Sequence, residues 1–198
     1  MSEPPAPKAI WDTAFEPYAA SIGYLIREWN HLQEKFCDLF CTIMEPATYD
    51  VSSSVWYAIQ NDRLQRSILL AAAAKRFSSK PHAKCLKGIE WAVTKANSLG
   101  SQRDDTIHSP VSILIGDPIE FISKYFFGHP RALNLKNKNL LTEFELYRQN
   151  AVILVHYLTK LERHARALVR NVPPERQQPL PEKPQLLTAP KKTKAKFQ

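Results

Sequence analysis

The sequence predicts an all-α protein: an antiparallel bundle of four or five helices with an irregular insert before the last long helix. Three observations support this prediction. Glycine is scarce, at 5 of 198 residues, whereas sheet-rich folds need frequent glycine turns. The 15 prolines crowd toward the two ends of the chain and elsewhere punctuate apolar segments. Along several long segments, apolar residues recur at steps of three and four, which is the period of an amphipathic helix.

The two ends of the chain differ in composition from its middle. We expect residues 1–13 to be a disordered lead, residues 14–171 to be the helical bundle domain, and residues 172–198 to be a disordered tail rich in proline and lysine. Six basic and two acidic residues lie from position 172 onward, so half of the net charge of +8 belongs to the tail. Such a cation cluster suits nucleic-acid binding and solubility equally well.

Three helices are expected in the first part of the domain. The first spans about 15–44, and the second spans roughly 54–77, with three serines ending at Ser54 as candidate N-caps. The third spans about 81–108, begins with a proline at a favourable first-turn position, and carries Arg103 on its inward stripe. The apolar stripe of the first helix consists of Ile22, Leu25, Trp29, Leu32, Phe36, Leu39 and Ile43.

Residues 110–139 interrupt the helical periodicity. Apolar residues alternate from Val111 to Ile115, and residues 132–135 form a second short apolar run, which allows a small hairpin with a short helix at about 118–127 between its strands. The last helix, about 140–171, keeps the three-four step throughout. Its stripe consists of Phe144, Tyr147, Ala151, Leu154, Leu158, Leu161, Ala165 and Leu168.

We expect a cytoplasmic protein without a membrane span, a metal or a cofactor. The N-terminus lacks a basic start followed by an apolar run, and no stretch approaches the roughly 18 apolar residues of a membrane span. Cys37 and Cys41 could share a metal with His31 or Cys85, but zinc sites usually use CxxC pairs or clustered histidines. Buried, reduced cysteines are the more common case, and no glycine-rich phosphate loop is present.

One segment carries a chemically suggestive set of residues: Arg103, Asp104 and His108. Histidine can transfer a proton near neutral pH, and arginine can hold a phosphate through two parallel hydrogen bonds. Asp104 lies one helical turn before His108, so its carboxylate could orient the imidazole. Together these groups could cleave a phosphodiester without a metal. In the alternative, structural interpretation, Arg103 pairs with an acid such as Asp104 or Glu90, and His108 caps the helix end.

This arrangement resembles the HEPN superfamily of small helical domains, in an uncharacterised bacterial branch. Members of that superfamily end a helix with an arginine, four to six residues (the first usually polar) and a histidine, as Arg103, Asp104 and His108 do here. The likeness in architecture covers about 15–171. The opening helix also resembles that of bacterial members, through Ile22-Gly23, Trp29-Asn30, Leu32 and Phe36, although a glutamate commonly follows the leucine where this chain has Gln33.

The resemblance implies a metal-independent endoribonuclease of a defence or toxin–antitoxin kind. His108 would be the acid or base at the ribose 2′-hydroxyl, Arg103 would stabilise the phosphorane, and Asp104 would orient His108. It also implies a homodimer in which two copies of the motif face one cleft, with RNA as the ligand. Many members are inactive, so the alternative function is a non-catalytic helical module that dimerises through its first and last helices or binds another protein.

Overall fold

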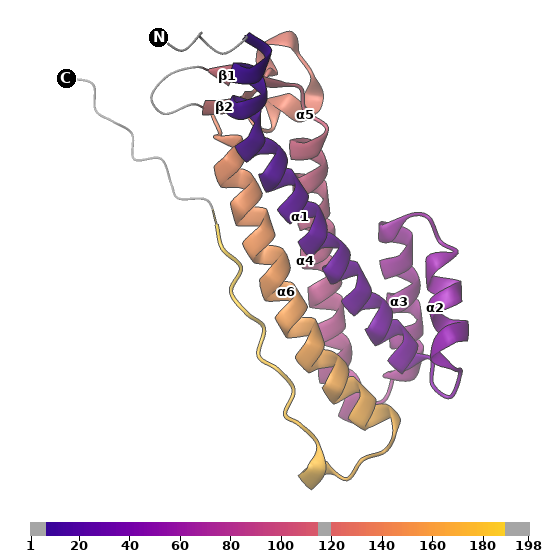
Figure 1. Ribbon diagram of the computed structural model, residues 1–198. Helices are drawn as coiled ribbons and strands as arrows, with labels where there is room; N and C mark the ends of the chain where they lie inside the picture. Colours follow the sequence, from indigo (N-terminus) through magenta and orange to yellow (C-terminus); the bar gives the residue numbers. More distant parts are fainter. Residues whose placement is uncertain (1–6, 115–119, 189–198) are drawn as a thin grey trace, which may run out of the picture.

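The computed structural model describes residues 7–114 and 120–188, and shows a mostly helical bundle (Figure 1). The predicted all-α bundle is confirmed, and a small hairpin lies in the insert, as the sequence allowed. The helices are α1 (Pro7–Ile43), α2 (Tyr49–Tyr57), α3 (Asp62–Arg76), α4 (Ala83–Ile107), α5 (Pro130–Leu133) and α6 (Leu140–Val169), and the strands are β1 (Val111–Leu114) and β2 (Glu120–Ser123). Short 3-10 turns lie at Lys80–His82, Tyr125–Phe127 and Pro174–Arg176.

The core lies between the three long helices, α1, α4 and α6, which run side by side (Figure 1). Their predicted apolar stripes face inward. Burying one leucine or phenylalanine stabilises the fold by about 1.5–3 kcal/mol, so these stripes hold the bundle together. The buried stripe residues of α1 and α6 are Leu25, Trp29, Leu32, Phe36, Leu39, Ile43, Phe144, Tyr147, Ala151, Leu154, Leu158, Leu161 and Ala165.

The second predicted helix is in fact two helices, α2 and α3. Thr48 caps α2, so the three serines expected as caps lie inside that helix. Asn61 caps α3 with its side-chain oxygen, which starts a new helix instead of continuing the first. Gln65 fastens the turn between them, because its Nε2 donates to the backbone oxygens of Trp56 and Ile59 at 3.0 and 2.9 Å. The cap at Asn61 thus divides the segment that the sequence predicts as one helix.

The insert contains a hairpin, but its second strand is not where the sequence placed it. Strands β1 and β2 pair antiparallel, with Val111 opposite Ser123. The helix expected at about 118–127 is therefore wrong: its described part is β2 and a 3-10 turn. Phe121 and Ser123 are buried and Glu120 is exposed, a period-two burial that suits a strand. The run at 132–135 falls at and beyond the end of α5, and Ile115 lies outside the described residues.

Both ends carry more structure than the composition predicts. Helix α1 begins at Pro7, within the expected lead, and residues 1–6 lie outside the described part. The segment from residue 177 to 188 is extended and runs back along α6 (Figure 1). The Asn150 side chain anchors it by exchanging two hydrogen bonds, of 2.7 and 3.0 Å, with the backbone of Leu187. The lysines at 191–196 lie outside the described residues.

Among the helices of the described ranges, none combines the length and the apolarity that crossing a lipid bilayer requires.

Candidate functional site

Arg103 lies near the end of α4, on the inward-facing stripe that the sequence predicts. Its Nε and Nη2 both donate to Oδ1 of Asp104, at 3.0 and 2.5 Å. Its guanidinium carbon lies 4.3 Å from the centre of the Trp29 ring, within the range of a cation–π contact. The side chain of Arg103 stays 21% exposed and that of Asp104 42% exposed. The guanidinium is therefore oriented by its neighbours and still reached by solvent.

A second arginine, Arg66 of α3, faces the same tryptophan from a buried position. Its side chain is 2% exposed, and its guanidinium carbon lies 5.6 Å from the Trp29 ring centre. Its Nε donates to Oδ1 of Asn97 at 2.8 Å, its Nη1 donates to Oε1 of Gln33 at 3.0 Å, and Asp62 lies 3.4 Å away. Burial lowers the pKa of this guanidinium, and Asp62 acts in the opposite direction. An arginine nevertheless keeps its charge in proteins, so the site holds a fixed buried cation.

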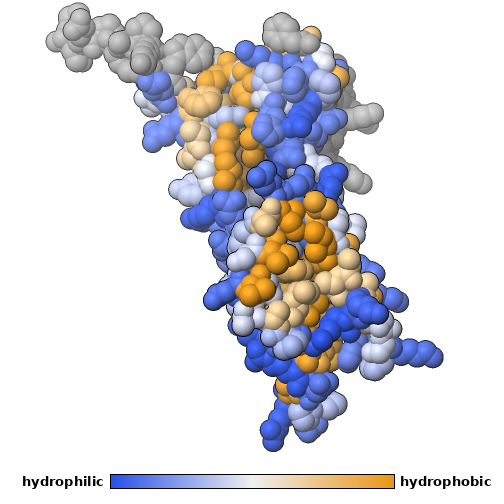
Figure 2. Space-filling model, turned by 90° about the vertical axis from the view of Figure 1, so that its right-hand side faces the viewer, coloured by the Kyte–Doolittle hydropathy of each residue, from blue (hydrophilic) through white to orange (hydrophobic). Residues whose placement is uncertain are grey.

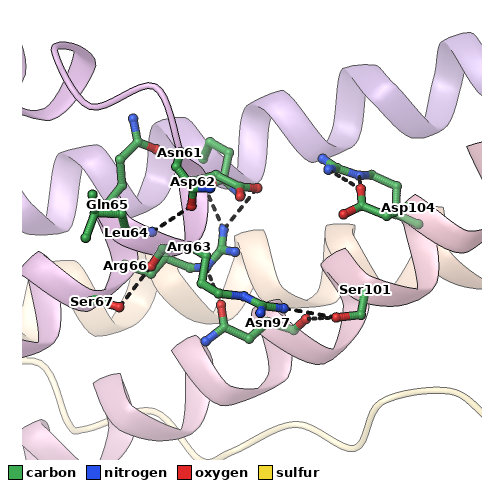
Figure 3. A network of polar contacts seen from close by, with 12 residues as sticks. Asn61, Asp62, Arg63, Leu64, Gln65, Arg66, Ser67, Asn97, Ser101 and Asp104 are labelled. Atoms are coloured by element: carbon green, nitrogen blue, oxygen red, sulfur yellow. Dashed lines mark hydrogen bonds and ion pairs between the residues drawn. The ribbon is translucent and has the colours of Figure 1, made fainter. Parts of the chain in front are cut away.

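These two arginines and Arg63 border a small polar cleft between α3 and α4. Figure 3 shows Arg63 and Arg66 of α3 with Asn97 and Ser101 of α4. The cleft has a volume of about 260 Å³. Arg63 spans it from α3 to α4, donating from Nη2 to the Ser101 hydroxyl at 3.2 Å. The residues that line it are polar or charged apart from one glycine: Asn61, Asp62, Arg63, Arg66, Asn97, Gly100, Ser101, Arg103 and Asp104.

Gly100, one of the lining residues, allows α4 to approach Trp29 of α1 closely. A Cβ at that position would lie 3.0 Å from Cη2 and 3.3 Å from Cζ2 of Trp29. Any larger residue would push the indole away from α4, and both neighbouring guanidinium groups contact that indole. The glycine therefore fixes the aromatic surface against which Arg66 and Arg103 are held.

The structure does not bring His108 into the cleft. His108 is the C-cap of α4 and is exposed, and it is not among the cleft-lining residues. Five residues turn an α-helix by about 140° beyond a full turn, so Arg103 and His108 lie on different faces of α4. In the described ranges no hydrogen bond or ion pair joins the imidazole to the Asp104 carboxylate, which Arg103 engages instead. Within one copy of the chain, therefore, the described residues show no contact through which the Asp104 carboxylate could orient the His108 imidazole.

The insert holds the end of α4 in place. The Asn134 side chain donates to Oδ2 of Asp105 at 2.8 Å, and Arg131 donates from Nη1 to the backbone oxygen of Asp104 at 3.3 Å. The Ser109 hydroxyl donates to the backbone oxygen of Asp105, closing the last turn. Arg131 of α5, Asn134 just after it and Ser109 therefore fix the turn that leads to His108.

The cysteines form no reactive centre in the described part of the chain. All three are free and buried, and the Sγ atoms of Cys37 and Cys41 lie 4.0 Å apart. Burial raises the pKa of Cys41 and of Cys85 to about 12, so both stay protonated at neutral pH. No group of three or more metal-ligating side chains gathers anywhere in the described ranges.

The sequence pattern singled out Arg103 but missed Arg63, Arg66 and Asn97. A usable signal was present for one of them. Arg66 stands three residues before Leu69 and seven before Ala73, both of which are fully buried, so it occupies the inward stripe of α3. An arginine at such a position needs polar partners, because an unpaired buried cation is costly. Nothing local in the sequence indicated that α4 supplies them.

No family model matches this chain, and neither a curated protein nor a solved structure shows significant similarity to it.

Proposed function

We propose that this chain is a HEPN-like domain that binds single-stranded RNA and cleaves it without a metal, in a defence or toxin–antitoxin setting. The observation that carries the proposal is the cleft in which Arg63, Arg66 and Arg103 converge. Arginine forks match the oxygens of a phosphate and keep their charge at any working pH. The three cysteines are free thiols, which suits a reducing cytoplasm.

In this proposal the two motif residues act on one phosphate from two copies of the chain. Arg103 binds the scissile phosphate and stabilises the charge that develops on it. His108 transfers the proton at the ribose 2′-hydroxyl or at the leaving oxygen. Because the two residues lie on different faces of α4, a homodimer supplies His108 of the second copy to the cleft of the first. Asp104 keeps the guanidinium in place, a positioning role in place of the expected contact with His108.

The test is cleavage of a fluorescent single-stranded RNA in the presence of a chelator. We expect His108→Ala to slow cleavage by about 10²–10⁴-fold, the usual contribution of a general acid or base. His156→Ala is the matched control, since it removes another exposed histidine. A substrate with a 2′-deoxyribose at the cleaved position should be inert. Equal cleavage by wild type and His108→Ala, or none by either, removes the catalytic proposal.

Mixing two inactive variants tests the shared site. In a heterodimer of Arg103→Ala with His108→Ala, one of the two clefts would carry both substitutions and the other would be intact. Activity should therefore return on mixing. If both residues of a site came from one chain, every site in the mixture would lack one group and activity would stay absent.

One observation favours a second candidate, a non-catalytic interaction module. Apolar side chains on α2 and at the start of α3 are at least half exposed: Val51, Val55, Tyr57 and Leu64. Figure 2, which looks onto this side of the molecule, shows an apolar patch bordered by hydrophilic residues. For this candidate, Val51→Glu should abolish self-association in analytical ultracentrifugation, and His108→Ala should change no measured property.

A further inference from the structure

Four arginines converge on a depression where α6 ends and the chain turns back. Arg163 and Arg166 stand on the last turns of α6, Arg170 is the C-cap of that helix, and Arg176 comes from the 3-10 turn that follows. All four side chains are exposed, and together they border a volume of about 270 Å³. We call this feature the arginine pocket. It lies apart from the cleft between α3 and α4, and the two share no lining residue.

Among the residues that the structure describes, two of the four arginines form ion pairs and two do not. Arg166 pairs with Glu162 at 2.6 Å, and Arg170 pairs with Glu45 at 2.9 Å. Cations are also favoured at a helix C-terminus, where the backbone carbonyls concentrate negative charge. Neither Arg163 nor Arg176 makes an ion pair within the described ranges, so neither guanidinium is engaged by a carboxylate there.

The chemistry of the pocket selects an anion with several oxygens. Each guanidinium offers a planar fork of donors that matches two phosphate oxygens. The net positive charge lies at an exposed position, where it raises the local concentration of anions. A phosphodiester group meets both conditions.

The distance between the arginine pocket and the cleft can be derived from the helix positions. A Cβ on Gly88 of α4 would lie 3.2 Å from Leu161, which places these two residues at the same level of the bundle. Arg103 lies fifteen residues further along α4, and the arginine pocket lies just beyond Leu161 in the opposite direction. At 1.5 Å per residue, the two sites are roughly 30 Å apart along the bundle. A ribodinucleotide cannot bridge that distance, but a longer strand can.

We propose that the arginine pocket binds the phosphodiester backbone of single-stranded RNA, as a second contact for a strand whose other part lies in the cleft. The inference rests on the proposed function for the identity of the ligand, but it does not require cleavage. It assigns Arg163 and Arg176 as the principal phosphate contacts.

The test compares RNA binding by Arg163→Ala/Arg176→Ala with binding by wild type across a series of salt concentrations. The probe is a single strand of roughly 16 nucleotides, the upper site size of a single-strand-binding fold. Losing two phosphate contacts should reduce the slope of log affinity against log salt by about 1.4, since each contact on a single strand contributes about 0.7. Both proteins bind more tightly as salt is lowered, but the affinity of the double variant should fall behind that of wild type by roughly a further 25-fold for each tenfold reduction in salt concentration. Arg27→Ala/Arg148→Ala, which removes the same charge from positions that line neither site, should leave the slope unchanged.

The outcomes separate this inference from the proposed function. If wild type binds RNA and the slope of Arg163→Ala/Arg176→Ala equals that of wild type, the pocket inference is overturned while the cleft proposal stands. If the slope falls as expected but no RNA is cleaved, the pocket inference stands and the catalytic proposal fails. If millimolar inorganic phosphate displaces the RNA from wild type and from the double variant equally, the pocket makes no specific contribution and the inference also fails. Thermal unfolding monitored by circular dichroism checks that the variants are folded.

Discussion

Replacing Gly100 by alanine tests whether the close approach of α1 and α4 builds the cleft. The new methyl group would lie 3.0 and 3.3 Å from two carbons of the Trp29 ring, closer than ordinary van der Waals contact. Trp29 is itself buried in the core, so the ring has little room to move. Arg66 and Arg103 both contact that ring, and the same substitution should therefore disturb the cleft.

The magnitude follows from two opposing effects. Alanine is favoured over glycine inside a helix by about 1 kcal/mol. Overpacking a rigid core position costs about 1–3 kcal/mol. Gly23 of α1 supplies the matched control, because nothing lies within 4 Å of a Cβ at that exposed helical position. Gly23→Ala should stabilise the fold by up to about 1 kcal/mol, and Gly100→Ala should be less stable than Gly23→Ala by the overpacking cost of about 1–3 kcal/mol.

Urea unfolding at equilibrium, followed by circular dichroism, measures both variants against wild type. Near-ultraviolet circular dichroism should change for Gly100→Ala and stay constant for Gly23→Ala, because only the first displaces an indole ring. Equal stabilisation by both substitutions, with an unchanged aromatic spectrum, would contradict this prediction. That result would mean that the Trp29 ring can move to accommodate the added methyl group. Gly100 would then not fix the position of the ring beside the cleft.

Two further predictions concern a pair of ionic side chains and the C-terminal segment. Arg170 lowers the pKa of Glu45, so the stability this pair contributes is fully present above the ordinary carboxyl pKa of 4.5 and is lost as the pH falls through the lowered value. In urea unfolding, the difference in free energy of unfolding between wild type and Glu45→Gln should therefore be constant near neutral pH and shrink below pH 4.5. A difference that grows in acid would contradict the predicted direction. Asn150→Ala removes two hydrogen bonds to Leu187, together about 1–3 kcal/mol, so exchange of the Leu187 amide should accelerate roughly 5- to 150-fold. Gln149→Ala is the control, and equal exchange rates in both variants would show that Asn150 does not anchor the segment.

The periodicity of apolar residues was enough to predict the long helices and their inward faces. The stripes of α1 and α6 repeat at the helical period over their whole length, and burial of those faces stabilises the bundle whatever the neighbouring segments do. The sequence also placed Arg103 on an inward stripe and predicted its pairing with Asp104 as one of two interpretations.

What surrounds those helices depends on contacts between segments that are distant in the sequence. Whether Arg66 is buried depends on Asn97 and Gln33, which other helices supply, and no local pattern records such a contact. The segment after residue 176 is too polar to fold alone, yet the amide of Asn150 satisfies the backbone of Leu187 and so orders it against α6. Periodicity reports the face that a helix buries, whereas a binding site depends on groups brought together from distant positions in the chain.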